Sequence, residues 1–479
     1  MFNLLIEAVI KNRLLVLLAL LAAIAVSLFM IPKLNLDAFP DVTNVQVAVN
    51  TEAPGLAAEE VEQLITYPIE AVMYALPDVE QVRSISKTGL SGVTVVFKEG
   101  VDIYFARQLV FERLQSAKEL IPDGVGMPTM GPNTSGLGQV YQYLLEAKPD
   151  ANIDSMALRS LNDWVVKLLI LPIDGVTDIL SFGGEVKQYQ VNLNPNKLLA
   201  YDLTQQDVSD ALDANNSNVG GWYMNRGQEQ LVIRGTGWFT PGEKGLTEIA
   251  QTPIKTIDGT VVKVADVANV ELGSEIRQGA VTLSKRNDQG EIVNRGEVVT
   301  GIVLKRMGAN TKQTIDGINA RVEMINQALP NGVEFKAIYD QAELISQAVQ
   351  TVIDALLLAF VFIIIVLALF LLDLRATFLV LLSIPISIGL ALSVMAWLGL
   401  SANLMSLGGI AVAIGMLVDG SVVMVENVFR HLGLKHNQHK PSSELVAIAA
   451  KEVARPIFFA SLIILTVFLP LFSFEGVEA

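Results

Sequence analysis

The chain has 479 residues, of which 51% are hydrophobic and only 17% are charged, and its mean hydropathy is +0.46. This composition excludes an ordinary soluble protein and indicates a chain with both membrane and aqueous parts. The net charge of −15 argues against nucleic acid as a partner, and the absence of cysteine excludes disulfides and thiolate metal ligands.

The first predicted element is an apolar segment, Leu14–Ile31, which Pro32 closes. Lys11 and Arg13 precede it, and the small-residue triplet Ala23-Ile-Ala25 within it would also suit a cleavable signal peptide. We favour an uncleaved membrane anchor, because the apolar run continues beyond that triplet. The two basic residues then place the N-terminus in the cytoplasm by the positive-inside rule.

Residues 33–346 predict a mixed α/β region outside the membrane, in which strands alternate with amphipathic helices. Its first part has the order β-α-β-β-α-β, which is the order of a ferredoxin-like, split βαβ unit. The elements named in it are a strand at Val45–Thr51, a helix at Ala57–Ala75, a turn at Lys87–Gly92, a strand at Val93–Phe97 and a helix at Ile103–Leu120.

The same pattern recurs further along the chain, interrupted by a long insertion. The insertion, at about residues 184–280, is rich in Gly, Asn, Gln and turn signals, and it is predicted to be β-rich. The second unit has predicted strands at Val140–Glu146, Val176–Ser181, Val298–Leu304 and Val333–Ile338, and predicted helices at Met156–Leu171 and Thr311–Ala328.

Four further apolar segments follow, each close to the roughly 20 residues that a membrane-spanning helix needs. They are Thr351–Leu372, Ala376–Leu398, Leu404–Val428 and Pro456–Phe474.

The charges between these segments predict their orientation. The tight link Asp373–Arg375 is expected in the cytoplasm, and so is the link before Pro456, because it is basic. Residues 33–346 then lie entirely on the opposite side of the membrane. Within the second link, Ser442–Val453 is predicted as a helix on the inner membrane surface. The basic residues of this second link are Arg430, Lys435, Lys440, Lys451 and Arg455.

The fourth apolar segment contains two acids, Asp419 and Glu426. A charge at the bilayer centre costs about 3 kcal/mol on insertion scales, so acids in this place call for a reason. The two residues are seven apart, so they share one face of a helix and are about 10 Å apart along its axis. Stacked carboxyl groups inside a membrane indicate a path for protons or cations. A core helix of a soluble protein is the alternative, and the surrounding apolar segments disfavour it.

Five sequence motifs stand out: Leu36–Val47, Ala53–Glu62, Tyr67–Glu70, Gly136–Gln142 and, in the fourth span, Val418–Asn427. Together they resemble the heavy-metal efflux (CusA/CzcA-type) branch of the resistance–nodulation–division superfamily. The match covers essentially the whole chain in the expected order. Proteins of this family have two tandem halves, and this chain resembles the first half without its sixth span. The resemblance thus implies a natural half, a truncation or an incomplete record.

The resemblance implies an α-helical membrane domain with an α+β periplasmic region. The periplasmic region would contain two ferredoxin-like porter subdomains and a β-rich docking insertion. The expected divisions are transmembrane helix 1 at 1–32, porter subdomain 1 at 33–138, porter subdomain 2 at 139–183 and 281–346, the docking insertion at 184–280, and transmembrane helices 2–5 at 347–479.

The resemblance also implies that Asp419 is the central residue of a proton relay. In the family this acid pairs with a lysine of the second half, which has no counterpart here. A carboxyl group in a low dielectric is driven towards its neutral form, so it can cycle between charge states and change helix packing. The alternative is a structural charge paired with another helix. Glu426 is the second relay candidate or an interfacial acid, and Asn427 is expected to orient it through a hydrogen bond.

The exported metal stays open. Met405 falls where the copper type has a methionine of its metal path, and thioethers suit Cu(I) and Ag(I), although methionine is more often a packing residue. Ala413 stands where the zinc, cobalt and cadmium type usually has an acid. Gly420-Ser421, in turn, departs from the paired alanines of the copper type.

The predicted function is proton-driven efflux of heavy-metal cations, either copper and silver or divalent metals. A phosphate-binding loop is absent from the sequence, so we expect a secondary transporter rather than an ATP-driven one or an enzyme, and no cofactor. By resemblance it would be a homotrimer in a Gram-negative inner membrane, with a periplasmic adaptor and an outer-membrane channel as partners. The alternatives are a drug or organic-compound pump of the same architecture, and a truncated, non-transporting remnant.

Overall fold

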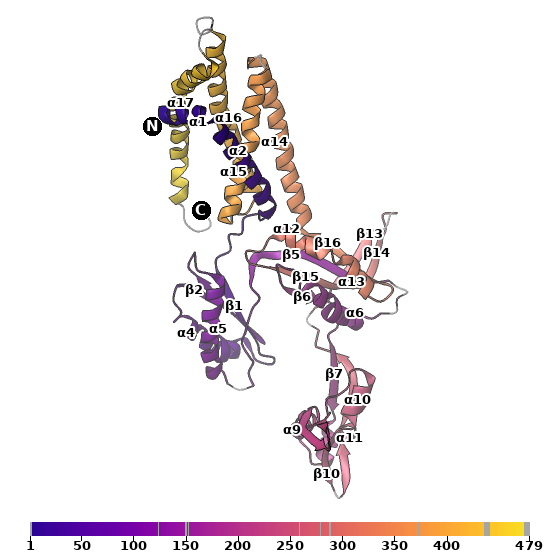
Figure 1. Ribbon diagram of the computed structural model, residues 1–479. Coiled ribbons are helices and arrows are strands. Elements are labelled where there is room, and N and C mark those ends of the chain that lie inside the picture. Colours follow the sequence, from indigo (N-terminus) through magenta and orange to yellow (C-terminus); the bar gives the residue numbers. More distant parts are fainter. Residues whose placement is uncertain are drawn as a thin grey trace.

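The computed structural model describes residues 2–122, 124–148, 151, 153–257, 259–277, 279–286, 289–371, 374–434 and 441–473. Leu372, Asp373, Lys435, Lys440 and Phe474, which were used in the predictions above, lie outside these residues. A region of small sheets extends from one end of a bundle of long helices (Figure 1).

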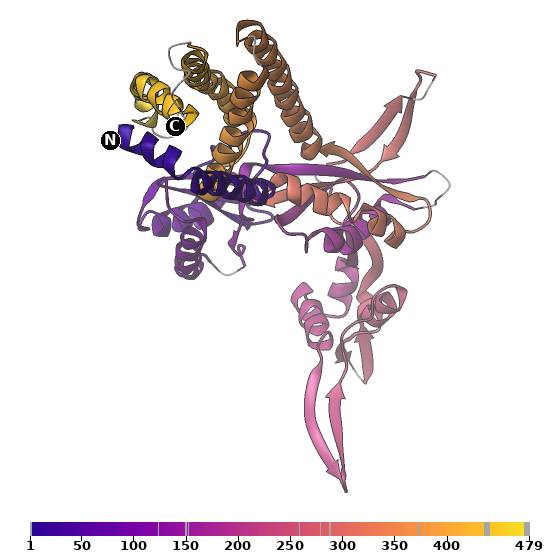
Figure 2. The same cartoon turned by 45° about the horizontal axis from the view of Figure 1, so that its top comes forward.

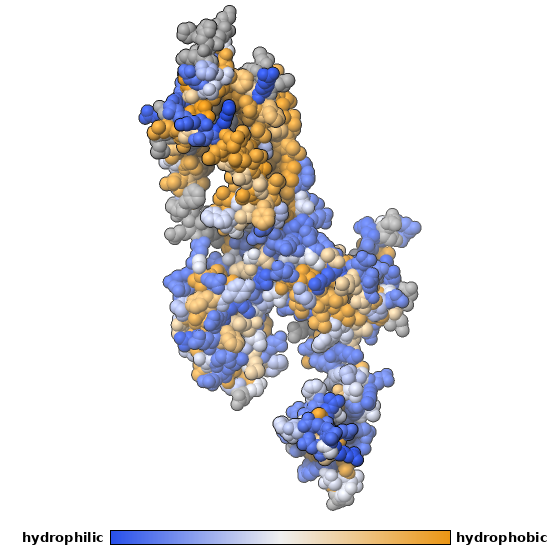
Figure 3. Space-filling model, viewed as in Figure 1, coloured by the Kyte–Doolittle hydropathy of each residue, from blue (hydrophilic) through white to orange (hydrophobic). Residues whose placement is uncertain are grey.

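Five helices of the described residues are long and apolar enough to cross a membrane, and each overlaps one of the predicted apolar segments over most of that segment's length. Their apolar side chains cover the outside of the bundle, whereas hydrophilic and apolar residues alternate over the surface of the sheet region (Figure 3). The helices are α2 (Arg13–Met30), α14 (Gln341–Leu371), α15 (Leu374–Leu398), α16 (Leu404–Gly433) and α17 (Ser442–Phe468).

The last of these helices corrects one prediction. The separate surface helix expected at Ser442–Val453 is the first part of α17, which continues through Pro456. Proline lacks an N–H group and crowds the preceding turn, so it either bends a helix or ends it. The sequence pattern alone does not distinguish these two outcomes. Leu445 and Ala449 are buried, so this first part packs inside the bundle rather than lying only on a surface.

A short helix that the sequence analysis did not identify precedes the first span. It is α1 (Phe2–Lys11), and Asn12 separates it from α2 with a non-helical backbone. α1 lies against α17, where the Lys451 ammonium pairs with the Glu7 carboxylate. That ion pair lowers the pKa of Glu7 below its usual value.

The first sheet has the strand order β2-β3-β1-β4. The predicted turn at Lys87–Gly92 is shorter in the structure: β2 runs to Lys87, β3 begins at Leu90, and only Thr88-Gly89 connect them. Gly89 has φ +75°, a conformation that glycine adopts without strain. The elements are β1 (Gln46–Glu52), α3 (Ala58–Val61), η2 (Glu62–Thr66), α4 (Tyr67–Met73), β2 (Val79–Lys87), β3 (Leu90–Phe97), α5 (Ile103–Leu120) and β4 (Thr129–Met130).

The second sheet has the order β16-β5-β15-β6. When its strands are matched to those of the first sheet in chain order, this is the same arrangement, and it is that of the split βαβ motif. The predicted repeat therefore has a counterpart in topology. The elements are β5 (Thr134–Ala147), α6 (Ser155–Leu161), η3 (Asn162–Val166), α7 (Lys167–Ile170), β6 (Val176–Phe182), β15 (Val299–Arg306), α12 (Thr311–Asn319), α13 (Val322–Ala328) and β16 (Val333–Asp340).

The insertion leaves the second sheet after β6 and returns through the antiparallel ribbon β7–β12. The β8–β9 hairpin projects from its far end (Figure 2), and a further hairpin, β13–β14, precedes β15. The elements are β7 (Lys187–Leu193), α8 (Pro195–Ala200), α9 (Gln205–Asn215), β8 (Val219–Arg226), β9 (Glu229–Gly235), α10 (Glu243–Ala250), β10 (Pro253–Ile257), β11 (Thr260–Lys263), α11 (Val264–Val267), β12 (Ala268–Ser274), β13 (Thr282–Arg286) and β14 (Ile292–Glu297).

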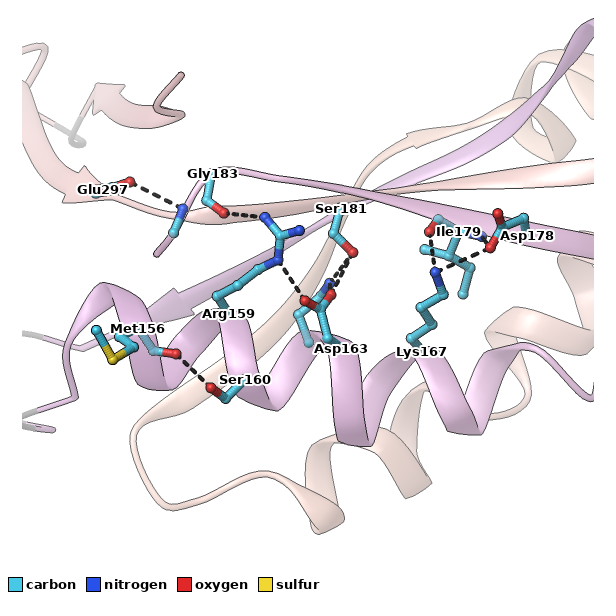
Figure 4. A network of polar contacts seen from close by, with 12 residues as sticks. Met156, Arg159, Ser160, Asp163, Lys167, Asp178, Ile179, Ser181, Gly183 and Glu297 are labelled. Atoms are coloured by element: carbon cyan, nitrogen blue, oxygen red, sulfur yellow. Dashed lines mark hydrogen bonds and ion pairs between the residues drawn. The ribbon is translucent and has the colours of Figure 1, made fainter. Parts of the chain in front are cut away.

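A polar network attaches the first helix of the second sheet to β6 (Figure 4). The Arg159 guanidinium donates to the Asp163 carboxylate at 2.7 Å and to the Gly183 carbonyl at 2.9 Å. The Ser181 hydroxyl donates to the same carboxylate at 2.7 Å. Asp163 lies in the π-helical segment η3, and the first helix of the first sheet contains a π-helical segment, η2, as well.

Close packing at one glycine gives a test of the second sheet. A Cβ atom at Gly301 would lie 2.0 Å from the Tyr143 ring. That ring cannot move away, because it is fully buried, stacks on Phe335 at 4.5 Å and donates its hydroxyl to Asn162 at 2.8 Å. We expect Gly301→Ala to destabilise the sheet by about 1–3 kcal/mol through overpacking.

Gly92 of the first sheet is the matched control, because a Cβ there would meet its nearest atom at 3.8 Å. Thermal unfolding of the purified protein, followed by near-ultraviolet circular dichroism, should show a lower midpoint for Gly301→Ala and little change for Gly92→Ala. Equal midpoints would contradict the packing argument.

Candidate functional site

The two acids of the fourth apolar segment lie along one groove between α14 and α16. Asp419 and Glu426 line it together with Gly415 and Val422, all from one face of α16, and the groove has a volume of about 750 Å³. The opposite wall comes from α14. Its lining residues there are Phe362, Ile363, Val366 and Leu367.

Tight packing beside the groove fixes its walls. Val418 is buried in a cluster with Leu367 of α14 and with Val380 and Ile384 of α15. The three helices are thus held together at the level of Asp419, the next residue of α16. Gly415, one turn earlier in α16, contributes no side chain to the groove, which leaves room in front of the carboxyl group.

Both carboxyl groups are open to the groove. Asp419 and Glu426 are exposed in this chain, and within the described residues neither has a hydrogen-bond or ion-pair partner. The predicted alternative of Asp419 paired with another of these helices therefore has no counterpart in the described residues. A helix that crosses a membrane with unpartnered acids on one face can receive protons or a cation there.

Asn427 has a different position from the one expected. It is buried, and its amide donates to the Ala449 carbonyl at 2.9 Å and to the Glu452 carboxylate at 3.1 Å, both on α17. Both amide hydrogens are thereby used, so none remains for the predicted bond to Glu426. Asn427 ties α16 to α17, whereas Glu426 faces α14.

Glu452 is a residue of this region that sequence reasoning missed. Its carboxylate receives the Asn427 amide, the His431 ring at 2.8 Å and the Arg430 guanidinium at 3.5 Å. Arg430 also lines the end of the groove next to Glu426. The sequence signal was only a basic link that contains two acids, Glu444 and Glu452, and the pairing depends on the packing of two helices.

Met405 is not brought near the acids. It lies in the first turn of α16, is 70% exposed, and is 14 residues before Asp419, or about 20 Å along the helix. The described residues contain no group of three or more His, Cys, Asp or Glu side chains placed to hold a metal ion.

Proteins of one known family resemble this chain in sequence and architecture. Residues 5–479 match the AcrB/AcrD/AcrF family. The chain belongs to this family. The predicted resemblance to the heavy-metal efflux branch of the resistance–nodulation–division superfamily is thereby confirmed, because similar proteins carry names of that branch.

The cation efflux system protein CzcA of Alcaligenes sp. (strain CT14) is 41% identical over 100% of this chain and 44% of its own length. The cation efflux system protein CusA of Escherichia coli (strain K12) is 35% identical over 98% of this chain and 44% of its own length. A crystal structure of a heavy metal efflux pump superposes with a TM-score of 0.83 at 32% identity, over 99% of this chain and 45% of that one. The chain therefore spans less than half the length of these relatives, and it has their transporter fold.

The position of Asn427 gives a second prediction. Asn427→Leu keeps a side chain of similar size but removes both bonds to α17, which we expect to weaken the α16–α17 contact by about 1–2 kcal/mol. Hydrogen–deuterium exchange of the purified protein should show faster exchange in the first half of α17.

Ser461→Ala on the same helix is the control, because that exposed hydroxyl bonds to Ile457 of its own helix. If exchange in Asn427→Leu stays at the level of the control while transport is lost, Asn427 acts in the relay rather than in packing.

Proposed function

We propose that this chain is the proton-accepting part of an inner-membrane efflux pump for heavy-metal cations. The observation that carries the proposal is the groove between α14 and α16, where two unpartnered carboxyl groups share one helix face. Membership of the family and the names of the relatives support metal efflux as the use of that groove.

The proposed mechanism is a proton relay along α16. Asp419 takes up a proton while it is open to one side of the membrane, and its neutral form allows α14 and α16 to pack more closely. Release of the proton restores the charge and the open groove. Glu426, two turns further along the same face, passes protons between Asp419 and the end of the groove at Arg430. Asn427 holds α16 against α17 during this cycle.

The cargo is a metal cation, either copper and silver or divalent. Among the relatives, CzcA of Cupriavidus metallidurans is named a cobalt-zinc-cadmium resistance protein and CusA a cation efflux protein, at 41% and 35% identity. Met405 is a candidate thioether ligand at the outer end of α16, where it would act at the entrance rather than in the groove.

The proposed assembly is a homotrimer with a periplasmic adaptor and an outer-membrane channel. The insertion supports this arrangement, because every residue of the β8–β9 hairpin is exposed, including Trp222 and Val232. Large apolar side chains on a projecting hairpin are typical of a surface that a partner covers.

An organic substrate is the second candidate. An apolar groove of about 330 Å³ lies between α14, α15 and α16, with Phe360, Pro385 and Ile388 in its lining. Cells that express the complete pump and survive dyes but not metals would favour this candidate.

The central test is Asp419→Asn in the complete reading frame that contains this chain. In a metal-sensitive strain challenged with Cu, Ag, Zn, Co, Cd and Ni, the unaltered pump should restore growth on the exported metals. Asparagine is nearly the same size but cannot take up a proton, so we expect export to fall by about two orders of magnitude or more.

Glu343→Gln is the matched control, since it removes a negative charge from the start of α14, far from the groove. Unchanged metal tolerance in Asp419→Asn would remove the relay. If the complete reading frame restored growth on none of the tested metals, the result would favour a remnant without transport activity.

A further inference from the structure

The segment after the first span, Leu34–Ala38, is attached to the start of α16. The Asp37 amide donates to the Ala402 carbonyl at 3.3 Å, and the Ala402 amide donates to the Asn35 carbonyl at 2.7 Å. The Leu404 amide donates to the Ala38 carbonyl at 3.4 Å. Because Leu404 is the first residue of α16, this segment has to move with the outer end of the helix that carries Asp419.

The start of α16 is itself rigid. Asn403 caps the helix, since its side-chain oxygen accepts from the Met405 and Ser406 amides at 3.0 Å each. The Ser406 hydroxyl accepts the Asn403 amide in return at 2.9 Å. Ala402 and Asn403 are buried, so this turn transmits a displacement of α16 without fraying.

The Asp37 side chain then joins this segment to the second sheet. Its carboxylate accepts from the Lys305 ammonium at 3.4 Å and from the Thr311 hydroxyl. Lys305 is near the end of β15 and its side chain is only 6% exposed, and Thr311 is the first residue of α12. The Asn310 amide adds a bond to the Leu34 carbonyl at 3.2 Å. Removal of either partner of such a buried ion pair is costly, because the other charge is then left buried without a partner.

The other wall of the groove reaches the same sheet by a different route. α14 starts at Gln341, directly after β16 ends at Asp340, with no loop between them. The Asp340 carboxylate accepts from the Ala342 amide at 2.7 Å and from Asn319 at 3.0 Å, and Ala342 is buried in the core of the second sheet. α14 is therefore a rigid extension of the edge strand β16.

We propose that the contact of Asp37 with Lys305 and Thr311 is the mechanical joint that transmits movement of α16 to the second sheet. This inference rests on the proposed function, because it assumes that protonation of Asp419 changes the spacing of α14 and α16. Since α14 holds the sheet at β16 and the joint holds it at β15 and α12, a change in that spacing tilts the sheet. Asp37 and Lys305 are positioning residues for transport and touch neither proton nor cargo.

The test uses the complete pump in liposomes and two readouts, metal export and a distance between the two sheets. This chain has no cysteine, so spin labels can be placed at Tyr104→Cys on α5 and Trp164→Cys in η3, two exposed positions, once cysteines elsewhere in the reading frame are replaced. In the unaltered pump the label distance should change between acidic and alkaline buffer, and Asp419→Asn should abolish that change.

We expect Asp37→Asn and Lys305→Met to abolish the same pH-dependent change and to lower metal export about tenfold or more. Asp174→Asn is the matched control. It breaks the ion pair of the neighbouring Arg306 at 3.0 Å, which lies within the second unit and does not involve residues 34–38. The control should keep both the distance change and export.

A disulfide variant guards against simple unfolding. Asp37→Cys with Thr311→Cys, combined with Lys305→Met so that no buried ammonium is left unpaired, would hold the joint closed without the ion pair. In its oxidised form we expect this variant to keep the distance change and export. A loss of either that a reductant reverses would overturn the proposal, and so would an Asp37→Asn pump that keeps both. If Asp419→Asn exports normally, the proton relay fails instead, so the two failures are distinguishable.

Discussion

The contact between α14 and α16 sets both what the helix bundle buries and what it leaves open. Val418 packs against Leu367 and the α15 side chains, while the adjacent Asp419 faces a groove. Had the helices closed fully at this level, a carboxyl group would be buried without a partner, which is far more costly than an open groove. The spacing of the two helices and the charge on Asp419 are therefore coupled, and the proposed proton relay depends on this coupling.

The sheet region is attached to both helices that form the groove. Continuity of β16 with α14 provides one attachment, and the segment Leu34–Ala38 provides the other, through hydrogen bonds to Ala402 and an ion pair to Lys305. The second sheet is thus attached to the helices of the groove at two separate points. Its rigid core, in which Tyr143 stacks on Phe335 against Gly301, allows it to respond as one body.

Much of the fold followed from sequence patterns that are local. Apolar length identified the five long helices, and the seven-residue spacing of Asp419 and Glu426 placed them on one face. Features that depend on distant residues were missed. Asp37 lies in a recognised motif, but its partner Lys305 is 268 residues away. Asn427 was expected to serve Glu426, and only the packing of α17 reveals its actual partners. Pro456 could end a helix or bend it, and tertiary contacts decide between the two.

The insertion is joined to the second sheet by a single two-stranded ribbon, β7–β12, and has its own small core around Val264 and Val267 (Figure 1). A two-stranded ribbon twists and flexes more readily than a four-stranded sheet, because fewer strands restrain it. The ribbon therefore allows the insertion, with its exposed β8–β9 hairpin, to change direction relative to the second sheet while the core of each keeps its packing.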